Sequence, residues 1–250
     1  MVSGEYSIRD VAPTNYSPLT VNHYPLTPTT VFIEQPPELF RKLYPSALWR
    51  MNPDEKAVYL TFDDGPIPVV TPWVLDLLDK HDVKATFFMV GDNIRKHPEE
   101  FRMVVERGHR IGNHTFNHIR GFSRKYFTSY SYLENTEEAH DFMLSICDPE
   151  TTDKALRPLL FRPPHGHMGW AQYMVLKRKY KIVMWDLVTR DYSKKLRGPQ
   201  VLANVMRYAR NGSIITFHDS LKSWDSGNLQ YALPRALSFL KEEGYEFKVL

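Results

Sequence analysis

The chain has 250 residues, of which 24% are charged, and its formal net charge at pH 7 is +3. This length favours one large domain, and the charges form no basic block of the kind that binds nucleic-acid phosphates. The single cysteine, Cys147, excludes an internal disulfide and a zinc site built from several thiolates. Any metal must therefore be held by histidines and carboxylates.

The first 55 residues differ in composition from the rest of the chain. Residues 1–31 are rich in Pro, Thr, Ser and Asn without any period, which predicts an extended or disordered arm. Residues 32–55 contain PPELFRKLYPSALW, which predicts a short helical lead-in that caps the bottom of a barrel. We find neither a signal peptide nor a run near the ~20 apolar residues of a membrane span, so we expect no integral membrane segment and, by default, a cytoplasmic protein.

Strand-like and helical runs alternate from residue 56 to residue 250, with no internal repeat. The predicted strands cover residues 57–63, 84–90, 109–114, 159–164, 181–187, 213–219 and 245–250. The predicted helices cover residues 71–82, 97–108, about 133–147, 170–180, 198–211 and 232–244. This order implies a parallel sheet with right-handed crossovers, and about seven strands favour a closed or partly closed (β/α) barrel.

Polar residues recur where the predicted strands end. In parallel α/β folds, the carboxyl ends of the strands meet at one rim, and the loops there form the functional cleft. Five segments bring side chains to this rim: Asp63 and Asp64, His114 and His118, Arg162, Asp191, and His218.

His114 and His118 stand four residues apart, which places both imidazoles on one face of a helical turn. Alone, such a pair is more often two surface or capping histidines. A carboxylate from a neighbouring strand end completes a set of two histidines and one aspartate that leaves positions open for water and substrate, and Asp64 is the natural third ligand.

Asp63 then has a separate task. A base beside a metal-bound water can remove its proton once the metal has lowered the pKa of the water from 15.7 to about 7. Two adjacent carboxylates repel each other unless cations separate their roles. The metal would neutralise one charge, and Arg162 could hold the other and point it at the water. Taken singly, Arg162 is more often a surface arginine and His218 a core histidine, but these alternatives weaken jointly because all the candidates stand at the carboxyl end of a strand.

Five stretches, in this order and spacing, resemble the motifs of the polysaccharide deacetylase family, the NodB-homology domain of carbohydrate esterase family four. They are TFDDGP, HTFNH, FRPPHG, WDLVTRDY and TFHD. The resemblance covers about residues 51–250. It implies a deformed (β/α) barrel of about seven parallel strands, removal of acetyl groups from N-acetylated sugars, and one divalent metal ion, usually zinc, with cobalt, nickel or manganese as alternatives.

The resemblance also implies roles for individual residues. Asp63 is similar to the general base, and Asp64, His114 and His118 to the metal ligands. Arg162 is similar to the residue that orients the base, His218 to the acid that protonates the leaving amine, and Asp191 to the carboxylate that orients this acid. The backbone N–H of His165 corresponds to the donor that stabilises the oxyanion together with the metal.

The chain departs from the family pattern around the acyl pocket. Tyr192 follows Asp191 where the family often has Trp, and Thr216 stands where Leu is frequent. His165 replaces a common aromatic residue, and Val188 a frequent aspartate. The predicted chemistry is therefore better supported than the identity of the sugar.

Three alternatives remain open at this point. The first is a hydrolase of another small amide or ureide on the same fold, and the second is a catalytically silent sugar-binding module. The third is a non-haem iron oxygenase, which also uses two histidines and a carboxylate but leaves Asp63 and His218 unexplained. A further hypothesis places a sugar-stacking wall on Phe122, Tyr126, Phe127, Tyr130 and Tyr132.

Overall fold

Eight strands form one sheet in the computed structural model, which describes residues 34–121, 129–146 and 148–250. All strand pairs are parallel, and seven strands follow the order β5-β4-β3-β2-β1-β7-β6, while β8 pairs with the first half of β1. The strands are β1 (Ala57–Asp63), β2 (Thr86–Met89), β3 (Arg110–Asn113), β4 (Leu160–Phe161), β5 (Lys181–Ile182), β6 (Leu187–Val188), β7 (Ser213–His218) and β8 (Glu246–Lys248). The predicted arm at residues 1–31 lies outside the described residues.

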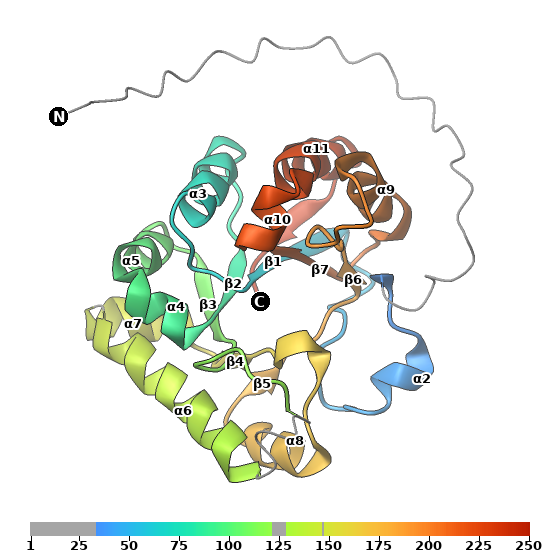
Figure 1. Ribbon diagram of the computed structural model, residues 1–250. Coiled ribbons are helices and arrows are strands. Elements are labelled where there is room, and N and C mark those ends of the chain that lie inside the picture. Colours follow the sequence, from blue (N-terminus) through green and yellow to red (C-terminus); the bar gives the residue numbers. More distant parts are fainter. Residues whose placement is uncertain (1–33, 122–128, 147) are drawn as a thin grey trace, which may run out of the picture. The chain divides into compact units, whose positions relative to one another are not determined.

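Helices surround these strands, as Figure 1 shows. They are α2 (Glu38–Arg41), α3 (Val70–Lys80), α4 (Gly91–Lys96), α5 (Pro98–Glu106), α6 (Ser129–Ile146), α7 (Pro149–Leu156), α8 (Trp170–Leu176), α9 (Gly198–Tyr208), α10 (Leu221–Asp225) and α11 (Asn228–Glu242). The short helices α4, α7 and α10 were not predicted, because each lies in a connection too short to show a period. None of the helices in the described ranges combines the length and hydropathy that crossing a bilayer requires.

The central strand β1 is buried on both faces, which explains its continuous apolar run. Val58, Leu60 and Phe62 pack in the core formed with the helices. The alternate residues point into the barrel, where Tyr59 joins a second cluster with Phe88. This alternation of side chains also directs Asp63 toward the interior of the barrel and brings it to the rim at the end of the strand.

The run predicted as one strand at 181–187 is two strands on opposite edges of the sheet. β5 pairs with β4, whereas β6 pairs with β7. Between them, Val183 N–H donates to Phe161 O at 2.8 Å, and Asp186 N–H donates to Ile214 O at 3.0 Å. Residues 183–186 therefore connect the two edge strands of the sheet, β5 and β6. This connection, which we call the seam, brings the two edges together and gives the expected deformed barrel.

The lead-in is less helical than predicted and lies elsewhere. Only Glu38–Arg41 forms the helix α2, and the segment then follows the seam instead of capping the bottom of the barrel. Leu48 N–H donates to Ile182 O, and Leu48 O accepts from Met184 N–H, both at 2.8 Å. The lead-in thus adds a bridge beside β5 and helps to close the barrel.

Candidate active site

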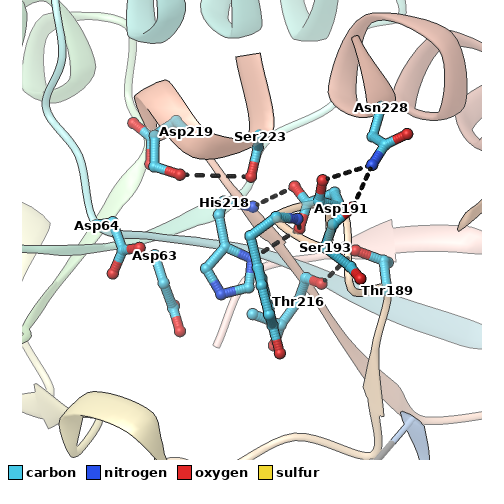
Figure 2. Close-up of polar contacts among 12 residues, drawn as sticks. Asp63, Asp64, Thr189, Asp191, Ser193, Thr216, His218, Asp219, Ser223 and Asn228 are labelled. Atoms are coloured by element: carbon cyan, nitrogen blue, oxygen red, sulfur yellow. Dashed lines mark hydrogen bonds and ion pairs between the residues drawn. The ribbon is translucent and has the colours of Figure 1, made fainter. Parts of the chain in front are cut away.

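A cavity of about 310 Å³ opens at the carboxyl ends of the strands. Five of the seven side chains that the sequence analysis placed at the rim line this cavity, and the other two, Arg162 and Asp191, bind the lining residues Asp63 and His218. Figure 2 shows the side chains from β1, β7 and the loop after β6 close together. The lining residues are Asp63, Asp64, His114, His118, Pro163, His165, Gly166, Trp185, Val188, Tyr192, Thr216, His218 and Lys222. Every lining residue comes from a strand end or from the loop or helix that directly follows one.

Asp64, His114 and His118 form the candidate metal centre, with one ligand atom from each within 4.8 Å of the others. Asp64 Oδ1 lies 3.1 Å from His118 Nε2 and 3.6 Å from His114 Nε2. Two ligand atoms at tetrahedral positions on zinc are about 3.3 Å apart, given zinc–ligand distances of 2.0 to 2.2 Å. The three side chains therefore fit a zinc-sized cation.

The state of His114 agrees with this fit. His114 Nδ1 lies 2.7 Å from the carbonyl oxygen of Arg162, which can only accept a hydrogen bond, so Nδ1 carries the proton and Nε2 keeps its lone pair. Burial lowers the pKa of His114 to about 4, which keeps its ring neutral at pH 7. Burial alone would raise the pKa of Asp64, but the hydrogen bond from His118 and the nearby His218 hold it well below its usual range.

Backbone conformation contributes to the trio. Asp64 has a φ of 81° and His118 a φ of 52°, both in the left-handed region that non-glycine residues rarely adopt. Such residues persist where the surrounding structure holds them and are concentrated at functional sites. Here the turn after β1 directs Asp64 toward the imidazoles of His114 and His118, which follow β3.

Asp63 and Arg162 form a buried pair beside this trio. Arg162 is fully buried, and its NH1 donates to Asp63 Oδ1 at 2.6 Å and to Thr61 Oγ1 at 2.8 Å. Its NH2 donates to Met184 O at 2.8 Å. Arg162 is thus an interior residue, with its guanidinium 4.1 Å from the ring centre of Phe88. Because the guanidinium uses Oδ1, the second oxygen of Asp63 remains for the cavity.

His218 and Asp191 form a second pair on the adjacent strand end. His218 is the register partner of Asp63 in the β1–β7 pairing, and Figure 2 shows both side chains on the same side of the sheet. His218 Nδ1 lies 2.8 Å from Asp191 Oδ1, and His218 N–H donates to Asp191 Oδ2 at 2.8 Å. Burial alone would lower the pKa of His218, but Asp191, followed by Asp64 and Asp63, raises it to about 9. This imidazole is held in the form that can donate a proton.

The three residues predicted at the oxyanion and acyl positions all line the cavity. His165 has a φ of 58°, and its ring centre is 4.7 Å from that of His118. The ring of Tyr192 packs edge-on against His218 at 4.7 Å. Thr216 lies with its hydroxyl oxygen 3.1 Å from that of Thr61, which also receives the hydrogen bond from Arg162.

Two buried residues that support the site were not predicted. Asp219 accepts hydrogen bonds from Gly65 N–H at 3.1 Å and from the Thr71 hydroxyl at 2.7 Å, and so ties the turn after β1 to the end of β7. Its position directly after His218 in TFHD was the available signal. Asn228, at the start of α11, donates from Nδ2 to the carbonyl oxygen of Asp191 at 3.0 Å, a contact without any sequence signal.

The proposed sugar-stacking wall falls mainly on residues 122–130, whose side chains lie outside the described part. Tyr132 is fully buried and packs edge-on against Phe161, so it belongs to the core. This residue is therefore not available for stacking on a sugar.

Comparison with known proteins agrees with this architecture. The family model for polysaccharide deacetylase matches residues 50–179, just over half of the chain. The chain is 34% identical over 204 residues to a peptidoglycan-N-acetylglucosamine deacetylase of Bacillus cereus, an alignment that covers 80% of this chain and 88% of that protein. It is 29% identical over 224 residues to the peptidoglycan-N-acetylmuramic acid deacetylase PdaA of Bacillus subtilis, covering 86% of this chain and 79% of PdaA.

A solved structure extends the likeness to three dimensions. The crystal structure of the Bc1960 peptidoglycan N-acetylglucosamine deacetylase in complex with 4-naphthalen-1-yl-N-oxidanyl-benzamide superposes with a TM-score of 0.72 at 30% identity. The match covers 84% of this chain and 92% of that chain. The deformed (β/α) barrel is thus shared with a solved carbohydrate deacetylase. The chain belongs to the polysaccharide deacetylase family.

Proposed function

We propose that this protein is a metal-dependent hydrolase that removes the N-acetyl group from an amino sugar of peptidoglycan. The observation that carries the proposal is that one cavity is lined by the Asp64–His114–His118 trio, by Asp63 with Arg162 bound behind it, and by His218 with Asp191 bound behind it. The choice of peptidoglycan follows the relatives, which are named for its two N-acetylated sugars.

The trio and the two pairs each have a task in amide hydrolysis. A divalent cation on the trio would polarise the acetyl carbonyl and lower the pKa of a water molecule. Asp63 accepts the proton of the attacking water on the oxygen that Arg162 does not use. As the new C–O bond forms and the C–N bond breaks, His218 donates the Nε2 proton to the leaving nitrogen, because an amine does not depart as an anion. Acetate and a free amino sugar result.

The remaining lining residues suit the substrate. The backbone N–H of His165 is our candidate for the donor to the oxyanion, which would act together with the cation. Tyr192, Thr216 and Val188 wall the side of the cavity next to His218, where we place the methyl group of the acetyl.

Acetate release tests the proposal directly. The purified protein is treated with a chelator, reloaded with zinc or left without metal, and incubated with peptidoglycan, N-acetylglucosamine oligomers and a panel of small cyclic amides. We expect acetate from the N-acetylated glycans in the zinc-loaded sample only. Binding of glycans without any release of acetate would instead support a silent sugar-binding module, and turnover restricted to the small amides would support the alternative hydrolase.

A further inference from the structure

Residues 34–50, the described first part of the lead-in, contact both ends of β6. At the start of β6, Arg41 NH2 lies 2.7 Å from Asp186 Oδ1. Beyond its end, Glu34 Oε1 lies 2.6 Å from Arg190 NH1. Nearly all of this segment precedes residue 50, where the match to the family model begins. The segment therefore reaches the residue directly before Asp191.

The Glu34–Arg190 pair is shielded from water. The two side chains are 8% and 12% exposed, respectively. Glu34 Oε2 is buried and has no hydrogen-bond partner among the described residues, so the carboxylate depends on Arg190 for its neutralisation. A buried ion pair loses far more when one partner is removed than an exposed pair does, because the remaining charge stays uncompensated.

Arg190 occupies a strained turn between two fixed neighbours. Thr189 donates to Thr216 O from both its N–H and its hydroxyl, each at 3.0 Å. Asp191, on the other side, holds His218 with both carboxylate oxygens. Arg190 itself has a φ of 63°, in the left-handed region. A change at its side chain is therefore transmitted to the orientation of Asp191.

We propose that Glu34 is a positioning residue for the Asp191–His218 pair and acts through Arg190. Glu34 neutralises the guanidinium and keeps it turned away from Asp191. Without Glu34, the uncompensated Arg190 would compete with His218 for the carboxylate of Asp191, because charge-assisted hydrogen bonds to guanidinium are strong. The inference rests on the proposed deacetylase activity, in which this pair supplies the leaving-group proton.

The test compares an amide with an activated ester in Glu34→Gln. The phenolate of an activated acetate ester leaves without an acid, so only the amide needs His218. We expect kcat on the amide to fall about tenfold with little change in KM, while ester turnover is largely kept. A merely structural role of Glu34 would lower both activities together.

Arg41→Gln is the matched control, because it removes the other ion pair of the same segment. Asp186 keeps its bonds from Arg210 and Ser213 in this variant. We expect a lower Tm and an unchanged amide-to-ester ratio. The double variant Glu34→Gln/Arg190→Gln also removes the guanidinium that has lost its partner. Its amide-to-ester ratio should recover toward that of the wild type, so the effects of the two substitutions should not be additive.

A second readout does not need activity. The proton on His218 Nδ1, hydrogen-bonded to Asp191, can be followed by NMR in the unliganded protein. We expect its resonance to shift or broaden in Glu34→Gln and to stay in place in Arg41→Gln. An unmoved resonance with an unchanged amide-to-ester ratio would overturn the inference. Failure of the wild type to release acetate would overturn the proposed function, and the NMR comparison would then decide the inference alone.

Discussion

Buried carboxylates at the two ends of the barrel have opposite surroundings. Near the start of β6, Asp186 is fully buried but receives hydrogen bonds from Arg41, Arg210 and Ser213. Burial alone would raise the pKa of Asp186, and these donors hold it below its usual range. At the opposite rim, burial, with the charges of Asp64 and Asp63, raises the pKa of Asp219 to about 8.

The two ends of the barrel differ in how many cationic side chains neutralise their carboxylates. Asp63, Asp64, Asp191 and Asp219 all lie at the rim, where Arg162 pairs with Asp63 and the protonated His218 with Asp191. Asp64 has only imidazoles around it. A structural carboxylate is neutralised by the protein itself, whereas the rim keeps negative charge that a divalent cation and a protonated histidine can balance. We therefore expect substitutions at the two ends to separate activity from stability.

The largest expected effect is at the rim. Asp63→Asn should lower turnover by ~10²-fold or more, because it removes the proposed base and leaves the proposed metal ligands in place. The amide oxygen of Asn can still accept from Arg162, so zinc content should change little, but Tm should fall because the fully buried Arg162 loses its counter-charge. Measured metal loss, with activity restored when zinc is resupplied, would mean that Asp63 and Asp64 have exchanged roles.

Asp186→Asn should lower stability without lowering activity. The buried carboxylate loses its charge while two arginines lose their partner, and we expect the free energy of unfolding to fall by roughly 2 kcal/mol, discounted because Arg210 is 43% exposed. Denaturant unfolding measures this loss. The kcat of the remaining folded protein should stay within about twofold of the wild type. A large drop in kcat at unchanged stability would contradict the division between the two ends.

Asp191→Asn should move the pH dependence. His218 has a pKa raised to about 9, and the charge of Asp191 is the main cause that raises it. Without this charge the imidazolium loses its proton at lower pH, so the alkaline limb of the rate profile should shift to lower pH. We expect amide turnover to fall about tenfold at neutral pH. An unmoved alkaline limb would remove the proposed partnership.

The smallest expected effect concerns His109, which lies directly before β3. It is 1% exposed, and burial lowers its pKa to about 4. Its Nδ1 accepts from Ala85 N–H at 3.2 Å, which fixes the neutral form. Because the unfolded chain binds a proton near pH 6.5 and the folded chain does not, stability is full above pH 6.5 and is lost toward pH 4.

For this histidine we expect a loss of about 1 kcal/mol between pH 8 and pH 5.5. His109→Asn keeps an acceptor for Ala85 N–H and removes the titration, so its unfolding free energy should fall less over the same interval. Parallel pH curves for the two proteins would show that His109 is protonated in the folded state.

The sequence was sufficient for the rim but not for its supports. Asp63, Arg162 and His218 follow apolar runs, and the rule that parallel strands end at one edge brings them together. Residues 181–187 were predicted as one strand, because the mostly apolar stretch KIVMWDL does not show locally that the chain leaves β4 and pairs with β7. That change depends on Leu48 and on the closure of the barrel.

The contacts that hold Asp191 could not be predicted from the sequence either. Glu34 and Arg190 are 156 residues apart, and Asn228 reaches Asp191 from the start of α11. Neither pair has a spacing that a local pattern could reveal. Asp219 was visible as a polar residue at a strand end, but its role depends on the close approach of Gly65, where an added Cβ would lie 2.0 Å from Asp219 Oδ2.

The most direct test of the account compares amide and activated-ester hydrolysis in the wild type, Asp63→Asn and His218→Ala, each loaded with zinc. Both substrates need an activated water, but only the amide needs a protonated leaving group. We predict that Asp63→Asn loses both activities to a similar extent, whereas His218→Ala loses amide cleavage and keeps much of its ester turnover. Equal losses on the two substrates in His218→Ala would contradict its role as the acid and would assign it instead to the oxyanion or acyl pocket.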